Sequence, residues 1–140
     1  MNSNMNTAVE IPSADLLPNY VIEADVPEEL SVENLYAELK KQKVKHAEVV
    51  LRQAVLETGW LKSYSCRERN NLFGFWYKKE YINFDSWKAS VTYYKDWQER
   101  HYKDDNQDYY DFLVKRGYAE DPIYIKKLKS ISLSSYIGAE

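Results

Sequence analysis

Glu57 is the residue of this sequence whose position best suits acid catalysis. Val50, Ala54 and Glu57 fall at spacings of four and three, so they share one face of a predicted helix that Glu57 nearly ends. A carboxyl held against apolar groups loses hydration, so its pKa rises and it keeps a proton near neutral pH. Two other interpretations stay open: Glu57 lies at the exposed edge of its stripe, or it pairs with Arg52 or Lys62.

Three separated motifs accompany this glutamate. They are LRQAVLETGWLKS at 51–63 with NNLFG at 70–74, FDSW at 84–87, and GYAEDPIY at 117–124. In order and spacing they resemble the glucosaminidase-type peptidoglycan hydrolases, the family 73 glycoside hydrolases, over about residues 31–131. Ser90, Tyr94 and Lys127 extend the likeness. Three motifs in one order make the resemblance specific, whereas ETG alone is a weak signal.

The resemblance implies a lysozyme-like fold, in which a helical body and a small flap border a glycan cleft. It implies that Glu57 is the general acid and that Tyr118 supports the reacting sugar in the active site. Tyr118 follows Gly117, a helix stop, and precedes a capped helix, so its phenol should be held in a defined place. Its hydroxyl could donate to the 2-acetamido group or to the attacking water. Ordinary packing at a helix junction is the alternative.

The second carboxylate of a glycosidase is less evident. Many members of the family carry a second Glu in a longer β-lobe, but here the interval is only residues 75–83 and its one acid is Glu80. Glu80 stands among lysines in a predicted tight turn, and Asp85 is better explained as a helix cap. Either Glu80 acts as a base on water, or the substrate's N-acetyl oxygen attacks its own anomeric carbon with help from Tyr118. A shortened lobe could also leave a glycan-binding domain without turnover.

Five further side chains are candidates for contact with substrate. Trp60 and Trp76 could stack on sugar faces or pack in the core. Phe73 could pack beneath Glu57. Asn71 belongs to the same motif, although its amide also suits a turn scaffold, and Tyr124 belongs to the third motif. Gly74 should allow a close approach to the cleft.

The elements that position these residues are mostly helical. Helices are predicted over about 31–42, 46–58, 85–102, 109–116 and 121–131, each with a cap or a glycine stop. Residues 60–83 show no helical period, but 73–77 and 81–84 favour strands around a turn at 78–80. The fold class is therefore mostly α, a lysozyme-like helical domain of about five helices with a small, shortened β flap. Residues 1–29, rich in Pro, predict an irregular arm before a glucosaminidase-like catalytic domain at 30–140.

Composition excludes several classes of protein. With a net charge of −3, the chain has no basic field for nucleic acid. The single cysteine, Cys66, is expected to be a small buried hydrophobe, and His46 and His101 lack metal-ligand spacing, so we expect no metal and no cofactor. No apolar run approaches the roughly 18 residues of a membrane span. A monomer is expected.

The expected substrate places the protein at the bacterial cell wall. Residues 1–7 lack the basic and apolar regions of a signal peptide, so export by another route, release at lysis or delivery by a phage is expected. Two alternatives to an enzyme stay open: a non-catalytic peptidoglycan-binding or structural module of a phage or secretion machine, and a helical protein-interaction domain.

Overall fold

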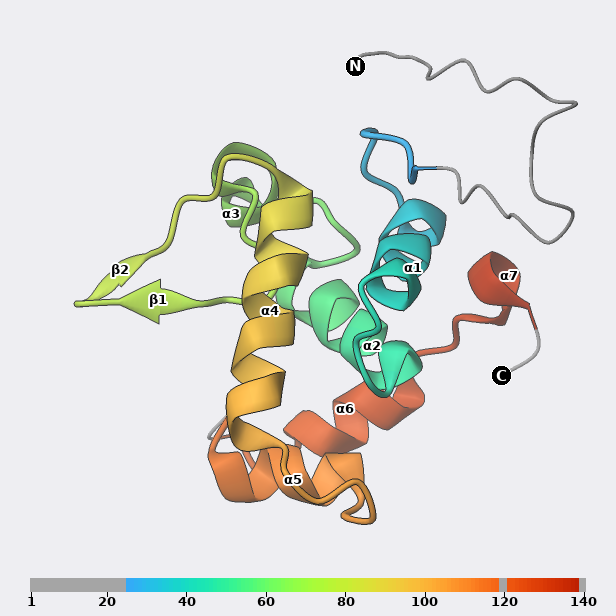
Figure 1. Ribbon diagram of the computed structural model, residues 1–140, viewed down its shortest axis with the longest axis vertical. Helices are drawn as coiled ribbons and strands as arrows, with labels where there is room; N and C mark the ends of the chain where they lie inside the picture. The colour runs from blue at the N-terminus through green and yellow to red at the C-terminus, as the bar shows by residue number, and fades with distance from the viewer. Residues whose placement is uncertain (1–24, 119–120, 139–140) are drawn as a thin grey trace, which may run out of the picture.

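The fold is a helical body with one projecting hairpin, as seen in a computed structural model that describes residues 25–118 and 121–138 (Figure 1). Its helices are α1 (Val32–Lys41), α2 (Ala47–Thr58), α3 (Tyr64–Arg69), α4 (Trp87–His101), α5 (Tyr109–Arg116), α6 (Tyr124–Ser130) and α7 (Ser134–Ile137). The strands are β1 (Trp76–Tyr77) and β2 (Glu80–Tyr81). The mostly α fold with a small β flap is confirmed, although the described residues form seven helices rather than about five.

Helix α2 carries Glu57 through the centre of the body. It contacts α1 and α6, and Figure 1 shows it between α1 and α4. Val50, Leu51 and Ala54 have no exposed surface, and each fully buried Val or Leu side chain stabilises the fold by about 1.5–3 kcal/mol. Gly59 ends the helix in the predicted left-handed conformation, and its N–H donates to the Val55 carbonyl. The last turn of α2 is therefore held firmly by the core.

Side-chain caps set where the helices begin. Ser31 accepts from the N–H of Asn34 at the start of α1, and Ser86, rather than Asp85, caps α4. The predicted start of the last long helix at Asp121 is wrong. Helix α6 begins at Tyr124 because residues 122–123 form a turn, in which the Asp121 carboxylate accepts from the N–H of Ile123 at 3.0 Å.

The segment before the flap contains a helix that the sequence pattern did not predict. Helix α3 has only six residues, too few for a hydrophobic period to appear. Ser63 caps it by accepting from the N–H of Cys66, and Cys66 is fully buried. Helix α7, with four residues, was missed for the same reason. Short helices depend on their caps and on packing more than on a periodic stripe.

The flap is a hairpin of two-residue strands, and Figure 1 shows it projecting away from the body. Lys78 and Lys79 form its turn with φ of 51° and 70°, as in the mirror-image turns that suit the twist of a hairpin. The predicted strands at 73–77 and 81–84 are present but shorter. So short a hairpin must be supported by neighbouring side chains.

The end of the predicted arm packs on α4. The indole N–H of Trp87 donates to the Glu28 carbonyl at 2.6 Å, and Lys88 donates to the Val26 carbonyl and pairs with Glu28. The boundary at residue 29 stays a prediction. Four apolar residues of the arm could lie on the domain, but they fall outside the described residues: Ile11, Leu16, Leu17 and Tyr20.

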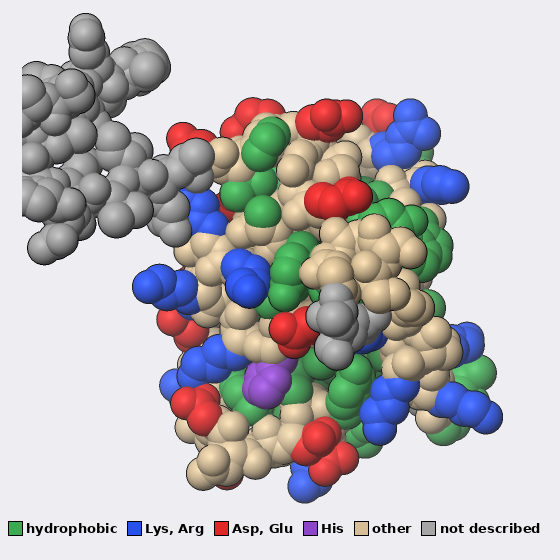
Figure 2. Space-filling model, turned by 90° about the vertical axis from the view of Figure 1, so that its right-hand side faces the viewer, with side chains coloured by type: hydrophobic (Ala, Val, Ile, Leu, Met, Phe, Trp, Pro, Cys, Tyr) green, Lys and Arg blue, Asp and Glu red, His purple; other side chains and the backbone are tan. Residues whose placement is uncertain are grey.

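Surface charge is mixed on the face that Figure 2 shows, where acidic and basic side chains are interspersed. The expectation of no nucleic-acid partner stays a prediction. Within residues 25–118 and 121–138, no helix combines the length and the apolar composition needed to cross a membrane.

Candidate active site

A cavity of about 420 Å³ lies beside the end of α2. It is lined by Glu57, Phe73, Gly74, Phe75, Trp76, Trp97, Arg116, Gly117 and Tyr118. These residues come from the end of α2, the loop before the flap, the flap, α4, and the segment where α5 ends. The fold thus brings together the ETG, NNLFG and GYAEDPIY motifs around one hollow of mixed aromatic and polar character.

Glu57 lies at the open edge of this cavity. The expectation of a carboxyl enclosed by apolar groups is wrong, because Glu57 is exposed, as the alternative of an exposed edge position predicted. The walls still remove part of its hydration, and this burial raises the pKa of Glu57 above its ordinary value. Among the described residues Glu57 has no ion pair with Arg52 or Lys62, and the Arg52 guanidinium donates to the Ile131 carbonyl. The carboxyl can therefore act as a proton donor.

Gly74 lies against the Glu57 carboxyl. A Cβ built at Gly74 would fall 2.7 Å from both Cδ and Oε2 of Glu57, closer than atoms in contact can approach. Its φ of +72° is also one that glycine adopts without steric cost. The expected close approach at this glycine thus occurs at the carboxyl itself, and the backbone of the NNLFG motif limits where the carboxyl can sit.

Tyr118 is fixed by its hydroxyl and by its ring. The hydroxyl donates to the Phe73 carbonyl at 2.6 Å, and the ring stacks on Tyr124 with centroids 6.1 Å apart. Burial, with a smaller contribution from the charge of Glu57, raises the pKa of Tyr118 well above its ordinary value. The phenol stays protonated, and its one proton is engaged. Its oxygen lone pairs are what it can offer to a ligand.

Trp76, Trp60 and Glu80 take different positions relative to the cavity. Trp76 lines it and is 62% exposed. Trp60 does not, and its ring packs 5.5 Å from that of Tyr136 in α7. Glu80 pairs with Tyr77 across the flap, while Trp76 pairs with Tyr81. Because opposed residues share a face and neighbours alternate, Glu80 lies on the face opposite Trp76 and is not a lining residue.

Asn71 supports the flap. Its side chain is 1% exposed, its amide donates to the carbonyls of Phe75 and Ile82, and its oxygen accepts from the N–H of Phe75. The expectation that Asn71 binds substrate does not fit this geometry, since its polar atoms are engaged with the backbone on both sides of the hairpin. Asn71 is scaffold, the alternative that its residue type suggested.

Phe73 and Tyr124 are both buried, but only Phe73 is among the described residues that line the cavity. Phe73 is 1% exposed and contacts the ring of Tyr94 at 4.7 Å. Tyr124 is 9% exposed, does not line the cavity and accepts from the Gln53 amide at 3.5 Å. The Tyr94 hydroxyl donates to Gln53, so buried phenols and amides link the core to Tyr124. The Phe73 carbonyl holds the hydroxyl of Tyr118, and the Tyr124 ring stacks on the Tyr118 ring.

Three lining residues were not predicted. Trp97 comes from α4 and lies 5.6 Å from the ring of Tyr118, and Phe75 follows Gly74 directly. Trp97 is three residues after Tyr94, which extends the family likeness on the same predicted helix, and this helical spacing could have identified it. Arg116 is the last residue of α5, and no local pattern marks it as part of the site.

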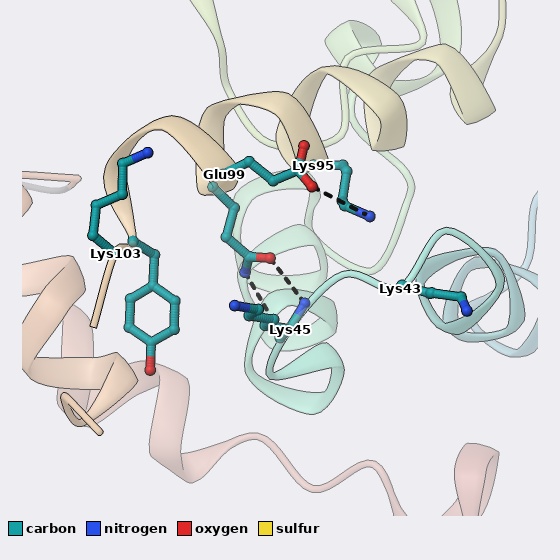
Figure 3. Close-up of a pocket in the computed structure, with 7 residues that line it drawn as sticks. Lys43, Lys45, Lys95, Glu99 and Lys103 are labelled. Atoms are coloured by element: carbon teal, nitrogen blue, oxygen red, sulfur yellow. Dashed lines mark hydrogen bonds and ion pairs between the residues drawn. The ribbon is translucent and has the colours of Figure 1, made fainter. Parts of the chain in front are cut away.

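A second cavity, of about 520 Å³, shares no lining residue with the first (Figure 3). Four of its seven lining residues are lysines. Two of them, Lys95 and Lys45, bond to the end of a helix or to a loop. Lys95 donates to the Gln42 carbonyl, which follows α1, and Lys45 pairs with Asp105 at 2.6 Å. Its one carboxylate, Glu99, pairs with Lys95 at 3.8 Å. Among its described lining residues, this cavity therefore has no carboxylate without an ion pair.

Within residues 25–118 and 121–138, no group of three or more His, Cys, Asp and Glu side chains could hold a metal ion. Burial raises the pKa of the Cys66 thiol to about 11, so the thiolate that a nucleophile or metal ligand needs is disfavoured.

Comparison with known proteins agrees with the geometry. A family model, Glucosaminidase, described as mannosyl-glycoprotein endo-β-N-acetylglucosaminidase, matches residues 32–136. No curated protein and no solved structure matches this chain at a significant level. The match spans every motif and every cavity residue described above. This chain therefore belongs to the glucosaminidase family, the family 73 glycoside hydrolases.

Proposed function

We propose that this protein hydrolyses a β-1,4 glycosidic bond of bacterial cell-wall peptidoglycan, as an endo-β-N-acetylglucosaminidase, with Glu57 as the general acid. The observation that carries the proposal is a single carboxyl of raised pKa, without an ion pair among the described residues, at the edge of an aromatic-walled cavity. A general acid must hold its proton until the leaving oxygen needs it, and a raised pKa supplies that condition.

The cavity favours assistance by the substrate's own acetamido group in place of a second carboxylate. Among the described lining residues Glu57 is the one carboxylate. In this mechanism Glu57 protonates the departing oxygen while the acetamido oxygen bonds to the anomeric carbon and the glycosidic bond breaks. Water then attacks the anomeric carbon, the bond to the acetamido oxygen breaks, and Glu57 takes a proton from the water. The second attack restores the starting configuration, so the product retains it.

Tyr118 can steady the acetamido group in this scheme. Because its proton is donated to the Phe73 carbonyl, its oxygen is placed to accept a hydrogen bond. The N–H of the acetamido group is a suitable donor. This role replaces the expected donation from Tyr118, which would require its bond to Phe73 to break first. Glu80 could act as the base only if the flap moved.

Arg116 favours a wall glycan over a neutral one. It is the cation that lines the cavity, and among the described residues its guanidinium has no ion pair. Peptidoglycan carries carboxylates on its stem peptides, and on its lactyl groups where the peptide is absent, whereas chitin carries none. Arginine recognises carboxylates with paired hydrogen bonds. The expected place of action is accordingly the bacterial cell wall.

Release of reducing ends from purified peptidoglycan tests the proposal. We expect Glu57→Gln to abolish release, while Glu48→Gln, an exposed glutamate at the other end of α2, should leave it unchanged. Glu80→Gln separates the mechanisms, because a base on water would be as essential as the acid. Release that persists in Glu57→Gln would exclude this acid.

A non-catalytic wall-binding module is the alternative function. The two-residue strands of the flap and the position of Glu80 outside the cavity favour it. It predicts binding to peptidoglycan that Glu57→Gln does not change, and no release of reducing ends by the unmodified protein.

A further inference from the structure

Three exposed rings and one half-buried guanidinium form a continuous surface that leads out of the cavity: Trp76, Tyr81, Arg69 and Tyr64. We propose that this surface, the aromatic platform, binds additional sugars of the glycan strand on one side of Glu57. The inference rests on the proposed function and extends it, because it makes cleavage depend on the length of the strand. Large exposed aromatic side chains that adjoin one another usually mark a binding surface.

The platform begins at the cavity wall. Trp76 lines the cavity, and its ring lies 5.9 Å from that of Tyr81 with 31° between the planes. The two residues face each other across the flap, so both rings lie on one side of it. They are 62% and 47% exposed. A sugar leaving the cavity therefore meets a second ring beside the first.

The platform continues from the flap onto α3. The Arg69 guanidinium lies 5.9 Å from the Tyr81 ring and 5.0 Å from the Tyr64 ring, so it bridges the two. Tyr64 begins α3, Arg69 ends it, and Tyr64 is 68% exposed. Figure 1 shows α3 and the flap on the same side of α4. The distances between neighbouring groups of the platform, 5.9, 5.9 and 5.0 Å, are each comparable to the length of one sugar unit.

One backbone and one side-chain hydrogen bond hold the two parts of the platform together. The N–H of Phe84, just after the flap, donates to the Arg69 carbonyl at 2.8 Å, and the Asn70 amide donates to the Phe84 carbonyl at 3.0 Å. Because α3 and the flap are connected in this way, the rings do not have to be ordered separately on binding. A preorganised surface loses less entropy when a ligand binds.

The chemistry of the platform fits a glycan strand. Tyrosine and tryptophan rings present flat apolar faces that suit the C–H faces of sugars, and their polar edges can bond to hydroxyls. Arg69 adds donors for N-acetyl carbonyls and for carboxylates. Continuity with the Glu57 cavity argues for the strand that the cavity would cut rather than for a separate protein partner.

Matched tyrosines on the two faces of the flap provide the test. Tyr81→Ala removes a platform ring, and Tyr77→Ala removes a ring from the opposite face that is more exposed, 67% against 47%. Affinity for a long glycan strand and for a tetrasaccharide is measured by calorimetry in a Glu57→Gln background, so that no turnover is needed. We expect Tyr81→Ala and Tyr64→Ala to weaken binding of the long strand by about three- to tenfold each, and Tyr77→Ala to leave it unchanged.

Two outcomes would overturn the platform. One is an equal effect of Tyr77→Ala and Tyr81→Ala on the long strand, which would indicate a general effect on the flap. The other is an equal loss of affinity for long and short substrates, which would place Tyr81 within the cavity's own function. Hydrolysis by the unmodified protein is scored separately, so failure of the proposed reaction and failure of the platform are distinguishable.

Discussion

Replacing Gly74 with alanine should displace the carboxyl of Glu57, the proposed acid. The added Cβ would lie 2.7 Å from Cδ and from Oε2 of Glu57 and 3.2 Å from Cγ. The neighbour is the end of a side chain, so the carboxyl rather than the backbone should yield. To reach ordinary contact at 3.4 Å it must move by about 0.7 Å.

The structure separates two costs of this substitution. A left-handed backbone at a non-glycine residue costs about 1–2 kcal/mol, equivalent to about 4–8 °C in Tm for a domain of this size. Misplacing a catalytic group by about 1 Å can cost 10²-fold in rate. We therefore expect Gly74→Ala to fold with a modestly lower Tm and to lose about 10- to 100-fold in kcat on peptidoglycan.

Gly59→Ala is the matched control. Gly59 also has a left-handed φ, of +57°, but a Cβ there meets no atom within 4 Å and the residue does not line the cavity. Both variants should lose similar thermal stability in a calorimetric scan, and only Gly74→Ala should lose turnover. If Gly74→Ala kept a kcat within about threefold of Gly59→Ala, the close approach would not control the position of the carboxyl.

Further predictions concern the acid, the flap support and the thiol. Because the folded pKa of Glu57 is raised, the native state holds its proton more readily than the unfolded state, and stability falls as pH rises from the unfolded toward the folded pKa. Glu57→Gln should therefore have a higher Tm than the unmodified protein at pH 7 and an equal one below about pH 4, and an equal difference at both pH values would refute this. Asn71→Ala removes three hydrogen bonds to the flap and should cost about 2–4 kcal/mol in denaturant unfolding, clearly more than Asn70→Ala, which removes one side-chain bond. Cys66, buried and with a pKa of about 11, should react with a thiol reagent at about pH 8 only after denaturation, and rapid labelling of the folded protein would contradict its burial.

Most helix boundaries could be predicted because their signals are local. Ser31 caps α1 through an N–H three residues away, and Gly59 and Gly117 end α2 and α5 in left-handed conformations. The prediction failed where a helix cap and a turn could both be formed by the same residue. Asp121 with Pro122 reads as a helix start, but the same carboxylate forms a turn with Ile123, and α6 begins later.

The site was predicted in part. The motif around Glu57 identified the candidate acid, because a family motif is recognised from the order and spacing of residues in the sequence alone. Arg116 was missed because nothing in its own segment says that it faces Glu57, whereas Trp97 stands at helical spacing from Tyr94 and could have been identified. Asn71 was assigned to substrate because its motif was recognised before its bonding partners in the flap were known.

By itself the sequence determined the helical class, the caps and the identity of the candidate acid. All of these depend on residues within about four positions of one another or on the order of motifs. Only the tertiary structure decided that the proton of Tyr118 goes to the Phe73 carbonyl, that Gly74 presses on the carboxyl of Glu57, and that Glu80 faces away from the cavity. These facts come from segments that meet only when the core packs, and packing distances are not encoded in local spacing.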